Sequence, residues 1–382
     1  MLGNNNGFAI ARRADRIVDG LNVEKFVAAD ATDWQKIKVL SMESIDREPL
    51  AVSSVRNLGL ALTKDHEAGK GQQLIRLAAK LSRRDLPTHF WLIQDYGRAN
   101  DLSNVLLHVD QALRTKEAAG QKLIPALHAG LASSDLVKPM VQLLRTDPPW
   151  KKQFWTQIEK FPGSLSNIGD VLVGLQEAGT VVDPSVPESI INQLAYSGQY
   201  AKAYDIYRKV YGKKRLPNKP EYLSNADFSA MTEGTVFDWT VSQNASLEVF
   251  LDPQRKALSV NVFGSIGGVA ASQVVELPAG TYRFSSKIDQ WDSALKDALF
   301  VSLTCTELGA VQSQPALRIN LDNEAINRQF TIPDPQCRYY VFQLMLQPPY
   351  RRDAMEILVS RMSIRRSGSA NETGARDALV SN

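Results

Sequence analysis

The sequence of 382 residues predicts a multidomain α + β protein, with an N-terminal helical solenoid followed by an antiparallel β-sandwich. Two observations lead to this prediction. Three positions recur after 34 residues, since Leu58, Leu62 and Ala78 return as Leu92, Tyr96 and Ala112. After about residue 220, helical spacing gives way to short runs that alternate apolar and polar residues. A chain of this length also has room for two separate cores.

The helical region contains two segments, 55–81 and 89–113, that superimpose at a shift of 34 residues, a period typical of helix hairpins. Ala78 and Ala112 fall at the same position of the second helix, where a small side chain lets two helices approach closely. A later segment resembles the tetratricopeptide repeat family at Gly198, Tyr200, Ala203, Tyr207 and Pro217. The resemblance implies a tetratricopeptide-like solenoid, which we expect to occupy residues 1–212. The segments between these regions keep helical spacing but lose the register, which indicates degenerate or shortened repeats.

Solenoids of this kind bind protein partners in a concave groove. Our candidates for such a protein-binding groove are Trp91, Asp95 and Arg98, although packing between repeats is the alternative for Trp91. All four histidines also fall in this region. They are too widely spread along the chain for the spacing of metal ligands, so we expect surface or interhelix roles for them.

The C-terminal region predicts a sandwich of about nine strands, separated by turn residues. The expected strands are 246–250, 257–263, 272–277, 281–288, 299–305, 316–321, 328–332, 338–347 and 355–365. Two prolines among basic residues indicate a linker at 213–221, which places the sandwich at 222–366. The small, polar segment 367–382 predicts a disordered tail. Trp239, beside Phe237, is expected to close one end of the core.

Landmarks along this region resemble the jelly-roll carbohydrate-binding modules of bacterial polysaccharide-active proteins. They are Leu-Ser-Asn-Ala-Asp-Phe at 223–228, Phe-Asp-Trp at 237–239, Leu-Pro-Ala-Gly-Thr-Tyr-Arg-Phe at 277–284, and the strand at 357–364. Joined to a tetratricopeptide-like arm, the whole chain is similar to repeat proteins of bacterial exopolysaccharide assembly and export. The resemblance implies a non-catalytic adaptor whose sandwich binds polysaccharide and whose arm binds envelope proteins. It further implies a periplasmic or envelope location.

Such proteins usually carry an N-terminal membrane anchor. Residues 1–13 contain no apolar signal segment, so we expect an exported form to have a targeting segment or anchor that is absent here. Two other functions stay open. The chain is alternatively a pure protein scaffold with a structural sandwich, or, less favoured, a glycan-cleaving enzyme. The acids available for glycoside hydrolysis include Asp227, Glu233, Asp238, Asp289 and Asp292.

A sugar site in such a module needs aromatic faces and polar side chains, because the C–H faces of sugars are apolar. Trp291 is our first candidate, since it lies beside Asp289 in a polar segment between two strands. Tyr350, Arg351 and Arg352 follow two prolines in another loop and would add a ring and two guanidinium groups. Related modules often place a calcium-ligating acid where this chain has Ser360 and Arg361. We therefore expect no metal, because arginine offers calcium no oxygen ligand.

The two cysteines, Cys305 and Cys337, lie at the ends of strand-like runs that neighbouring strands would bring together. A disulfide between them is a candidate, with two buried thiols as the alternative. Disulfides persist only outside the reducing cytosol, so a bond would agree with an envelope location.

Composition and motifs limit the remaining functions. The 44 basic and 41 acidic residues give a net charge of +3 without a basic stripe or a nucleic-acid motif, so we expect no nucleic-acid partner. No stretch of 18 apolar residues predicts a membrane span. The glycine-rich segment 264–268 lacks the Gly-Lys-Ser/Thr ending of a phosphate loop and predicts a turn. No catalytic or cofactor motif is present, so we expect neither a catalytic residue nor a cofactor.

Overall fold

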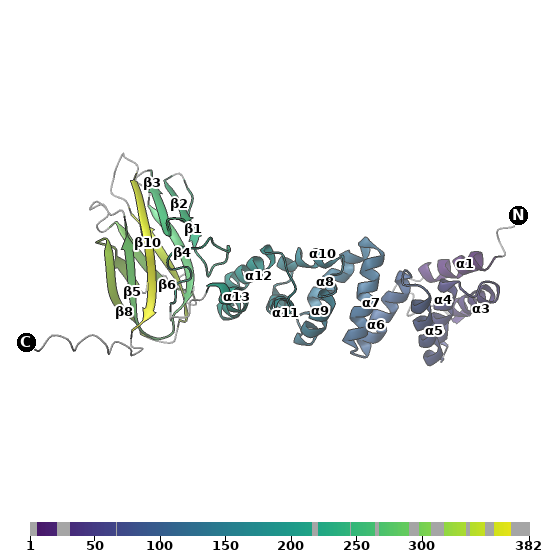
Figure 1. Ribbon diagram of the computed structural model, residues 1–382. Coiled ribbons are helices and arrows are strands. Elements are labelled where there is room, and N and C mark those ends of the chain that lie inside the picture. Colours follow the sequence, from purple (N-terminus) through teal and green to yellow (C-terminus); the bar gives the residue numbers. More distant parts are fainter. Residues whose placement is uncertain are drawn as a thin grey trace, which may run out of the picture. The chain divides into compact units, whose positions relative to one another are not determined.

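The computed structural model describes residues 6–20, 31–65, 67–215, 221–244, 246–263, 267–289, 298–306, 317–333, 337–347 and 355–367. Contacts within the chain divide it into two compact units, Met1–Thr180 and Val181–Asn382. The described part of the first unit is helical, whereas the second unit contains a pair of helices followed by two antiparallel sheets (Figure 1). The predicted α + β class with a β-sandwich is confirmed.

The first unit is built from short helices connected by tight turns. They are α1 (Gly7–Gly20), α3 (Ala31–Arg47), α4 (Val52–Lys64), α5 (Ala68–Leu81), α6 (Leu86–Arg98), α7 (Leu102–Thr115), α8 (Gly120–Gly130), α9 (Val137–Leu144), α10 (Lys151–Trp155) and α11 (Leu165–Glu177). Among the residues that the structure describes, no helix is long and apolar enough to cross a membrane.

The hairpins α4–α5 and α6–α7 repeat the 34-residue period of the sequence. Each bound of the second hairpin equals the corresponding bound of the first plus 34. Ala78 and Ala112, the small residues that repeat, are both fully buried. The helices α4 and α5 come especially close at two glycines, because a Cβ atom on Gly59 would lie 2.9 Å from the carbonyl oxygen of Gly71. This close approach requires glycine at both positions, whereas the second hairpin has Ile93 and Val105 there.

A buried arginine ties three helices of this unit together. Arg56 of α4 is 5% exposed, and its guanidinium donates to both carboxylate oxygens of Asp85, at 2.5 and 2.7 Å. The same guanidinium pairs with Asp15 of α1 at 2.5 Å. Asp85 also caps α6, since it accepts a hydrogen bond from the backbone N–H of Thr88. Satisfying both carboxylates allows the charge of Arg56 to be buried.

The second unit begins with the hairpin α12 (Ser185–Tyr196) and α13 (Tyr200–Arg215). Gly198, in the turn between them, has φ of +81°, a conformation that favours glycine. The rings of Tyr204 and Tyr207 pack against Phe237, with ring centroids 5.1 and 5.4 Å apart. These contacts tie the hairpin to the sandwich. The contacts within the chain therefore place the start of the second unit at Val181, so this unit includes α12 and α13. The sequence instead predicts a domain boundary at the linker 213–221.

The remaining strands are β1 (Thr240–Val241), β2 (Leu247–Asp252), β3 (Ala257–Val262), β4 (Gly268–Glu276), β5 (Gly280–Ile288), β6 (Leu299–Cys305), β7 (Leu317–Asn320), β8 (Ala325–Ile332), β9 (Tyr339–Leu346) and β10 (Met355–Arg366). They form two five-stranded sheets, in the orders β1-β4-β9-β6-β7 and β2-β3-β10-β5-β8. The chain crosses repeatedly between these sheets, as in a jelly roll. All nine predicted strands are present. The additional strand, β1, has two residues, which is too short to show alternation in the sequence.

One apolar cluster fills the space between the two sheets. Trp239 belongs to it and is 1% exposed, so its predicted place in the core is confirmed. Cys305, at the end of β6, is joined to Cys337 in a disulfide across 32 positions of sequence. The bond links the end of β6 to the segment leading into β9, its neighbour in the same sheet.

Candidate functional site

Most of the sugar-binding residues predicted from the sequence cannot be placed. Trp291, Tyr350, Arg351 and Arg352 lie outside the described residues. Asp289 is described and exposed, directly after β5. The ammonium group of Lys287 lies 2.7 Å from its carboxylate and lowers the pKa of Asp289. This aspartate already has a cationic partner, and its sugar-binding role stays a prediction.

The residues predicted to form a protein-binding groove belong to α6. Trp91 is half-buried and packs against a cluster that includes Trp34 and Leu92. The carboxylate of Asp95 accepts a hydrogen bond from Gln72 at 3.1 Å and lies 3.6 Å from Arg76, both on α5, whereas Arg98 is exposed. Trp91 thus packs between helices, and the proposed groove stays a prediction.

A row of polar residues crosses all five strands of the sheet that contains β9. The pairing of neighbouring strands aligns them, in the order Thr240, Ser272, Gln343, Ser302 and Arg318. Their neighbours along the strands point into the core, as Phe342 and Leu344 do on either side of Gln343. Since side chains alternate along a strand, the polar row lies on the outer face of the sheet. At the usual spacing of strands, it is about 19 Å long.

The middle of this polar row has unused hydrogen-bonding capacity. Within the described part of the chain, the side chains of Ser272, Ser302 and Gln343 form no hydrogen bond with another protein group. Ser302 is 6% exposed, so its hydroxyl group is largely removed from bulk solvent. Apolar side chains flank the row on the same face, including Val341 on one side and Met345 on the other. The face therefore combines polar groups with apolar strips.

Arg318 ends this polar row at the edge strand β7. Its guanidinium carbon lies 3.6 Å from the centroid of the Phe300 ring, and its Nε donates to Asn320 at 3.2 Å. The ring beneath it is only 5% exposed, whereas Arg318 itself is exposed. Stacking and the hydrogen bond fix the plane of the guanidinium without neutralising its charge.

A pocket of about 470 Å³ opens to solvent beside Arg318, where β7 and β8 form one edge of the sandwich. Its lining is divided between apolar and polar residues. The apolar residues are Leu317, Ile319 and Phe330, and the polar residues are Arg318, Asn320, Asp322, Arg328 and Gln329. One oxygen of Asp322 is buried and has no hydrogen-bond partner among the described residues. A lining that joins apolar and polar residues can contact a ligand that carries both kinds of surface.

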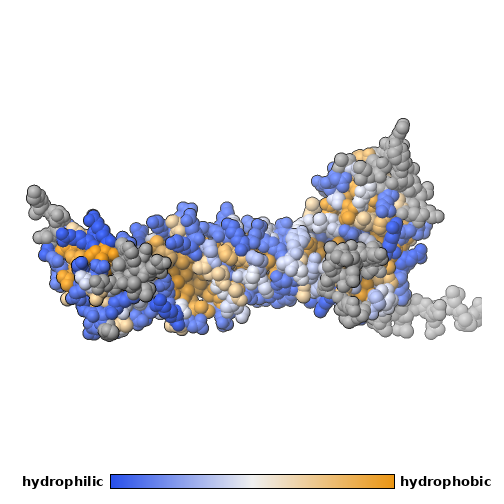
Figure 2. All heavy atoms as spheres, turned by 180° about the vertical axis from the view of Figure 1, so that it is seen from behind, coloured by the Kyte–Doolittle hydropathy of each residue, from blue (hydrophilic) through white to orange (hydrophobic). Residues whose placement is uncertain are grey.

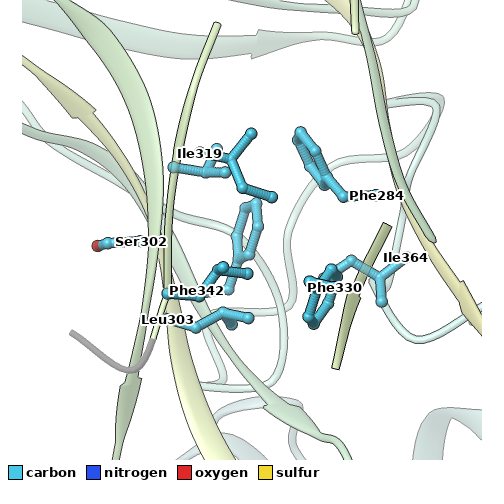
Figure 3. Close-up of a pocket in the computed structure, with 9 residues that line it drawn as sticks. Phe284, Ser302, Leu303, Ile319, Phe330, Phe342 and Ile364 are labelled. Carbon is cyan, nitrogen blue, oxygen red and sulfur yellow. The ribbon is translucent and has the colours of Figure 1, made fainter. Parts of the chain in front are cut away.

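The apolar part of this pocket continues into the core. Figure 3 shows Ile319, Leu303 and Phe342 facing Phe284 and Phe330 across a narrow gap between the sheets, while Ser302 points away from it. This inner gap does not admit a water molecule. It therefore acts as packed core beneath the open pocket, and ligand binding is confined to the outer space.

Several acids considered for catalysis have structural roles. Asp238 is fully buried and accepts hydrogen bonds from the backbone N–H groups of Glu233 and Trp239, at 2.9 and 3.0 Å. Asp227 is exposed and accepts a hydrogen bond from the hydroxyl group of Ser229 at 2.8 Å. Asp292 lies outside the described residues. Among the described residues, no group of three His, Cys, Asp or Glu side chains is arranged to hold a metal ion.

The first unit exposes apolar side chains on its helices. Figure 2 shows apolar residues gathered among hydrophilic ones over part of the helical region. Its exposed large apolar residues are Phe8 of α1, Val39 and Met42 of α3, Leu50 before α4, Leu77 and Leu81 of α5, and Leu107 of α7. Exposed apolar groups of this kind are common at protein contact surfaces.

Sequence reasoning missed both the polar row and the edge pocket. The sequence did predict the strands that carry Gln343 and Ser302, at 338–347 and 299–305. The alignment of five strands that are distant in sequence could not be read from any one of them. That alignment depends on strand order and register, which only the folded sheet provides.

Comparison with known proteins finds solved structures that are similar to parts of this chain. No family model matches, and no curated protein matches. One similar structure is the second N-terminal cellulose-binding domain of Cellulomonas fimi β-1,4-glucanase C, with 18% identity and a TM-score of 0.25, covering 41% of this chain and 99% of that chain. Another is accessory secretory protein 1, 2 and 3 of Streptococcus pneumoniae, with 11% identity and a TM-score of 0.24, covering 34% of this chain and 100% of that chain.

A third similar structure is a carbohydrate-binding module described as CBM4, with 15% identity and a TM-score of 0.21, covering 34% of this chain and 94% of that chain. The TM-scores of these three structures range from 0.21 to 0.25. Similarities at this level assign no function to the chain.

Proposed function

We propose that the second unit binds a polysaccharide along the polar row of its outer sheet face, and that the first unit docks proteins. On this proposal the chain is a non-catalytic adaptor in exopolysaccharide assembly or export, located in the periplasm or cell envelope. Its helical repeats would serve as a tetratricopeptide-like docking arm. The observation that carries the proposal is the polar row, from Thr240 to Arg318, that crosses every strand of one sheet.

The chemistry of this face suits a sugar chain. Sugar rings present hydroxyl groups at their edges and C–H groups on their faces. Ser272 and Gln343, both half-buried, offer donors and acceptors for the hydroxyl groups, and Val341 and Met345 offer apolar contact for the ring faces. Neighbouring strands lie about 4.8 Å apart, so a polymer running across them would meet a polar side chain at each strand.

Two features of the chain support the docking role of the first unit. The exact 34-residue offset between α4–α5 and α6–α7 is the period of tetratricopeptide hairpins, which commonly carry protein-binding surfaces. The exposed apolar residues of α3, α5 and α7 add contact surface for a protein partner.

The proposed location rests on a different observation. The disulfide in the second unit favours an oxidising compartment such as the periplasm.

Affinity electrophoresis of the full chain through gels containing soluble polysaccharides tests the sugar-binding proposal. We expect at least one polymer to retard the protein, and Gln343→Ala to weaken retardation about 5- to 10-fold through the loss of direct hydrogen bonds. The matched control is Gln254→Ala, which removes an exposed glutamine from the turn between β2 and β3.

Two results would count against sugar binding along this face. If no polymer retards the wild-type chain, the unit has a purely structural role and the chain is better described as a protein scaffold. If a polymer retards the Gln343→Ala variant as strongly as it retards the wild-type chain and the Gln254→Ala variant, the polar row does not contact that polymer. Release of reducing ends from a bound polymer would contradict the non-catalytic part of the proposal.

A further inference from the structure

We infer that the pocket at the β7–β8 edge binds a carboxylate-bearing sugar unit, so that the polymer recognised is an acidic polysaccharide containing uronic acids. This inference rests on the proposed function and narrows it to one class of polymer. The pocket adjoins the polar row, because Arg318 belongs to both. A polymer lying along the polar row would therefore place one of its sugar units in the pocket, at the β7 end of the row.

Arg318 supplies the first element of acid recognition. Its guanidinium is stacked 3.6 Å above Phe300, and its Nε is occupied by Asn320. The two terminal nitrogen atoms form no ion pair with a carboxylate in the described parts of the second unit. A guanidinium that is fixed in plane with unpaired N–H groups matches the two oxygens of a carboxylate.

Arg328 supplies a second positive charge, from the other strand that lines the pocket. It lies in β8 and pairs with Phe284, which is a core residue. Paired residues share a face, so Arg328 lies on the inner side of the edge strand, yet it remains exposed because the pocket opens there. No carboxylate of the described residues forms an ion pair with it. An inward charge at a sheet edge also discourages edge-to-edge pairing, which is its possible structural role.

The third element is Asp322, whose buried oxygen has no hydrogen-bond donor among the described residues. A buried acceptor without a partner is costly, and a ligand hydroxyl group would satisfy it. With Arg318, Arg328 and Asp322, the pocket carries a net charge of one positive unit. Leu317 and Phe330 offer apolar contact for a ring face.

A uronic acid matches these three elements together. It carries a carboxylate for a guanidinium group, hydroxyl groups that donate to Asp322, and C–H groups for the apolar residues. A neutral sugar would leave both guanidinium groups without a counter-ion. A sulfate ester would also accept hydrogen bonds from a guanidinium group, but it is tetrahedral and bulkier than a planar carboxylate, so a sulfated polymer serves as a comparison.

The test compares one polymer with and without its carboxylates, and adds a sulfated polymer to measure general anion binding. Affinity electrophoresis of the full chain is run with polygalacturonate, with the same polymer after reduction of its carboxyl groups, and with dextran sulfate. We expect retardation by polygalacturonate, at least 10-fold weaker retardation by the reduced polymer, and weak retardation by dextran sulfate.

Variants test the two arginines. Arg328→Gln and Arg318→Met are expected to weaken retardation by polygalacturonate about 10-fold or more, because each removes a charged hydrogen-bonding partner. Arg318→Met keeps an apolar chain over Phe300. The matched control is Arg361→Gln, which removes an exposed arginine from β10 that does not line the pocket. Unchanged thermal unfolding shows that each variant is folded.

The outcomes separate this inference from the proposed function. Equal retardation by native and reduced polygalacturonate overturns acid recognition and leaves sugar binding intact. Arg328→Gln behaving like Arg361→Gln overturns the assignment to the pocket, and the charge of Arg328 then serves only to protect the sheet edge. Strong retardation by dextran sulfate that salt abolishes shows general anion binding. If no polymer retards the chain, both the inference and the proposed function are wrong.

Discussion

The two compact units are stabilised by different kinds of interaction. In the described part of the first unit, buried polar groups connect helices, as Arg56 connects α1, α4 and α6 and as the buried His89 and His108 pair through Nδ1 atoms 3.1 Å apart. The second unit instead has one apolar cluster between two sheets and a disulfide at its margin. In a helical repeat each helix packs mainly on its neighbours, and buried polar groups add specific connections between them. In a sandwich the two sheets enclose one continuous core.

This contrast also separates the proposed roles. The polar groups that we propose to bind sugar lie on the outer face and edge of the second unit, so we expect them to be replaceable without loss of the fold. In the first unit the described polar connections are interior, so changes to them are expected to affect stability before any docking surface. Four changes test how far this difference extends.

The largest expected effect comes from breaking the buried ion network with Arg56→Ala. Removing one partner leaves Asp15 and Asp85 partly buried without their counter-ion, so we expect a loss of about 3 to 5 kcal/mol from the first unit. Hydrogen exchange measured by mass spectrometry resolves the two units and should show faster exchange in α1, α4 and α6, with no change in the second unit. The control is Arg114→Ala, whose exposed pair with Asp110 within one helix contributes about 1 kcal/mol at most. Equal effects of the two variants would contradict the network.

Removing the disulfide should destabilise the second unit alone. The double variant Cys305→Ala and Cys337→Ala is expected to lose about 3 to 4 kcal/mol, because the bond closes a loop between positions 32 apart. Denaturant unfolding with and without a reductant measures this loss. The first unit contains neither cysteine, so its exchange should not change. A reductant that also destabilises the double variant would show an effect unrelated to the disulfide.

Acid should destabilise the first unit through its buried histidines. Burial, with a smaller contribution from His89, lowers the pKa of His108 to about 4 from its ordinary value of 6.5. Between these values the unfolded chain binds a proton that the folded chain excludes, so stability falls as the pH falls from about 6.5 to 4. The stability lost through His108 alone is at most about 3 kcal/mol.

Urea unfolding across this pH range, followed by the helical circular dichroism signal, measures the loss. His108→Gln should flatten the dependence, although burial also lowers the pKa of His89 and of His128. The second unit has no histidine and should not share the effect. An unchanged slope in His108→Gln would show that this side chain does not titrate as inferred.

The smallest effect is expected at the contact between α12 and the sandwich. The amide of Asn192 donates to the carbonyl oxygen of Gly234 at 2.9 Å and accepts from the N–H of Val236 at 2.8 Å. Asn192→Ala should cost about 1 to 2 kcal/mol and speed hydrogen exchange near Val236. The control is Gln193→Ala, since the Gln193 amide bonds only within its own helix, to Ser189, among the described residues. Equal exchange in the two variants would mean that α12 is not held by this amide.

Local sequence patterns predicted much of the fold. The strand Leu299–Cys305 was predicted at its observed bounds, because alternation and turn residues are local signals. The 34-residue recurrence likewise gave the spacing of α4–α5 and α6–α7. By contrast, the hydrogen bonds of Asn192 and the aromatic packing of Tyr204 on Phe237 join segments that no local pattern relates.

The candidate site was predicted less well, because it too depends on segments that are distant in the sequence. The search for exposed aromatic residues in loops selected Trp291 and Tyr350, which lie outside the described residues. The site inferred from the structure uses Gln343, Ser302 and Arg318, each an unremarkable polar residue in its own strand. They form a row only because antiparallel pairing aligns strands that are distant in sequence.

By itself, the sequence determined the α + β class, the 34-residue spacing of two helix hairpins and the order of nine strands. Those properties follow from hydrophobic periodicity and turn chemistry, which act over a few residues. The tertiary structure decided strand order, register, the buried network around Arg56 and the pocket between β7 and β8. Each of these depends on which distant segments meet, and that choice is made by packing of the whole chain.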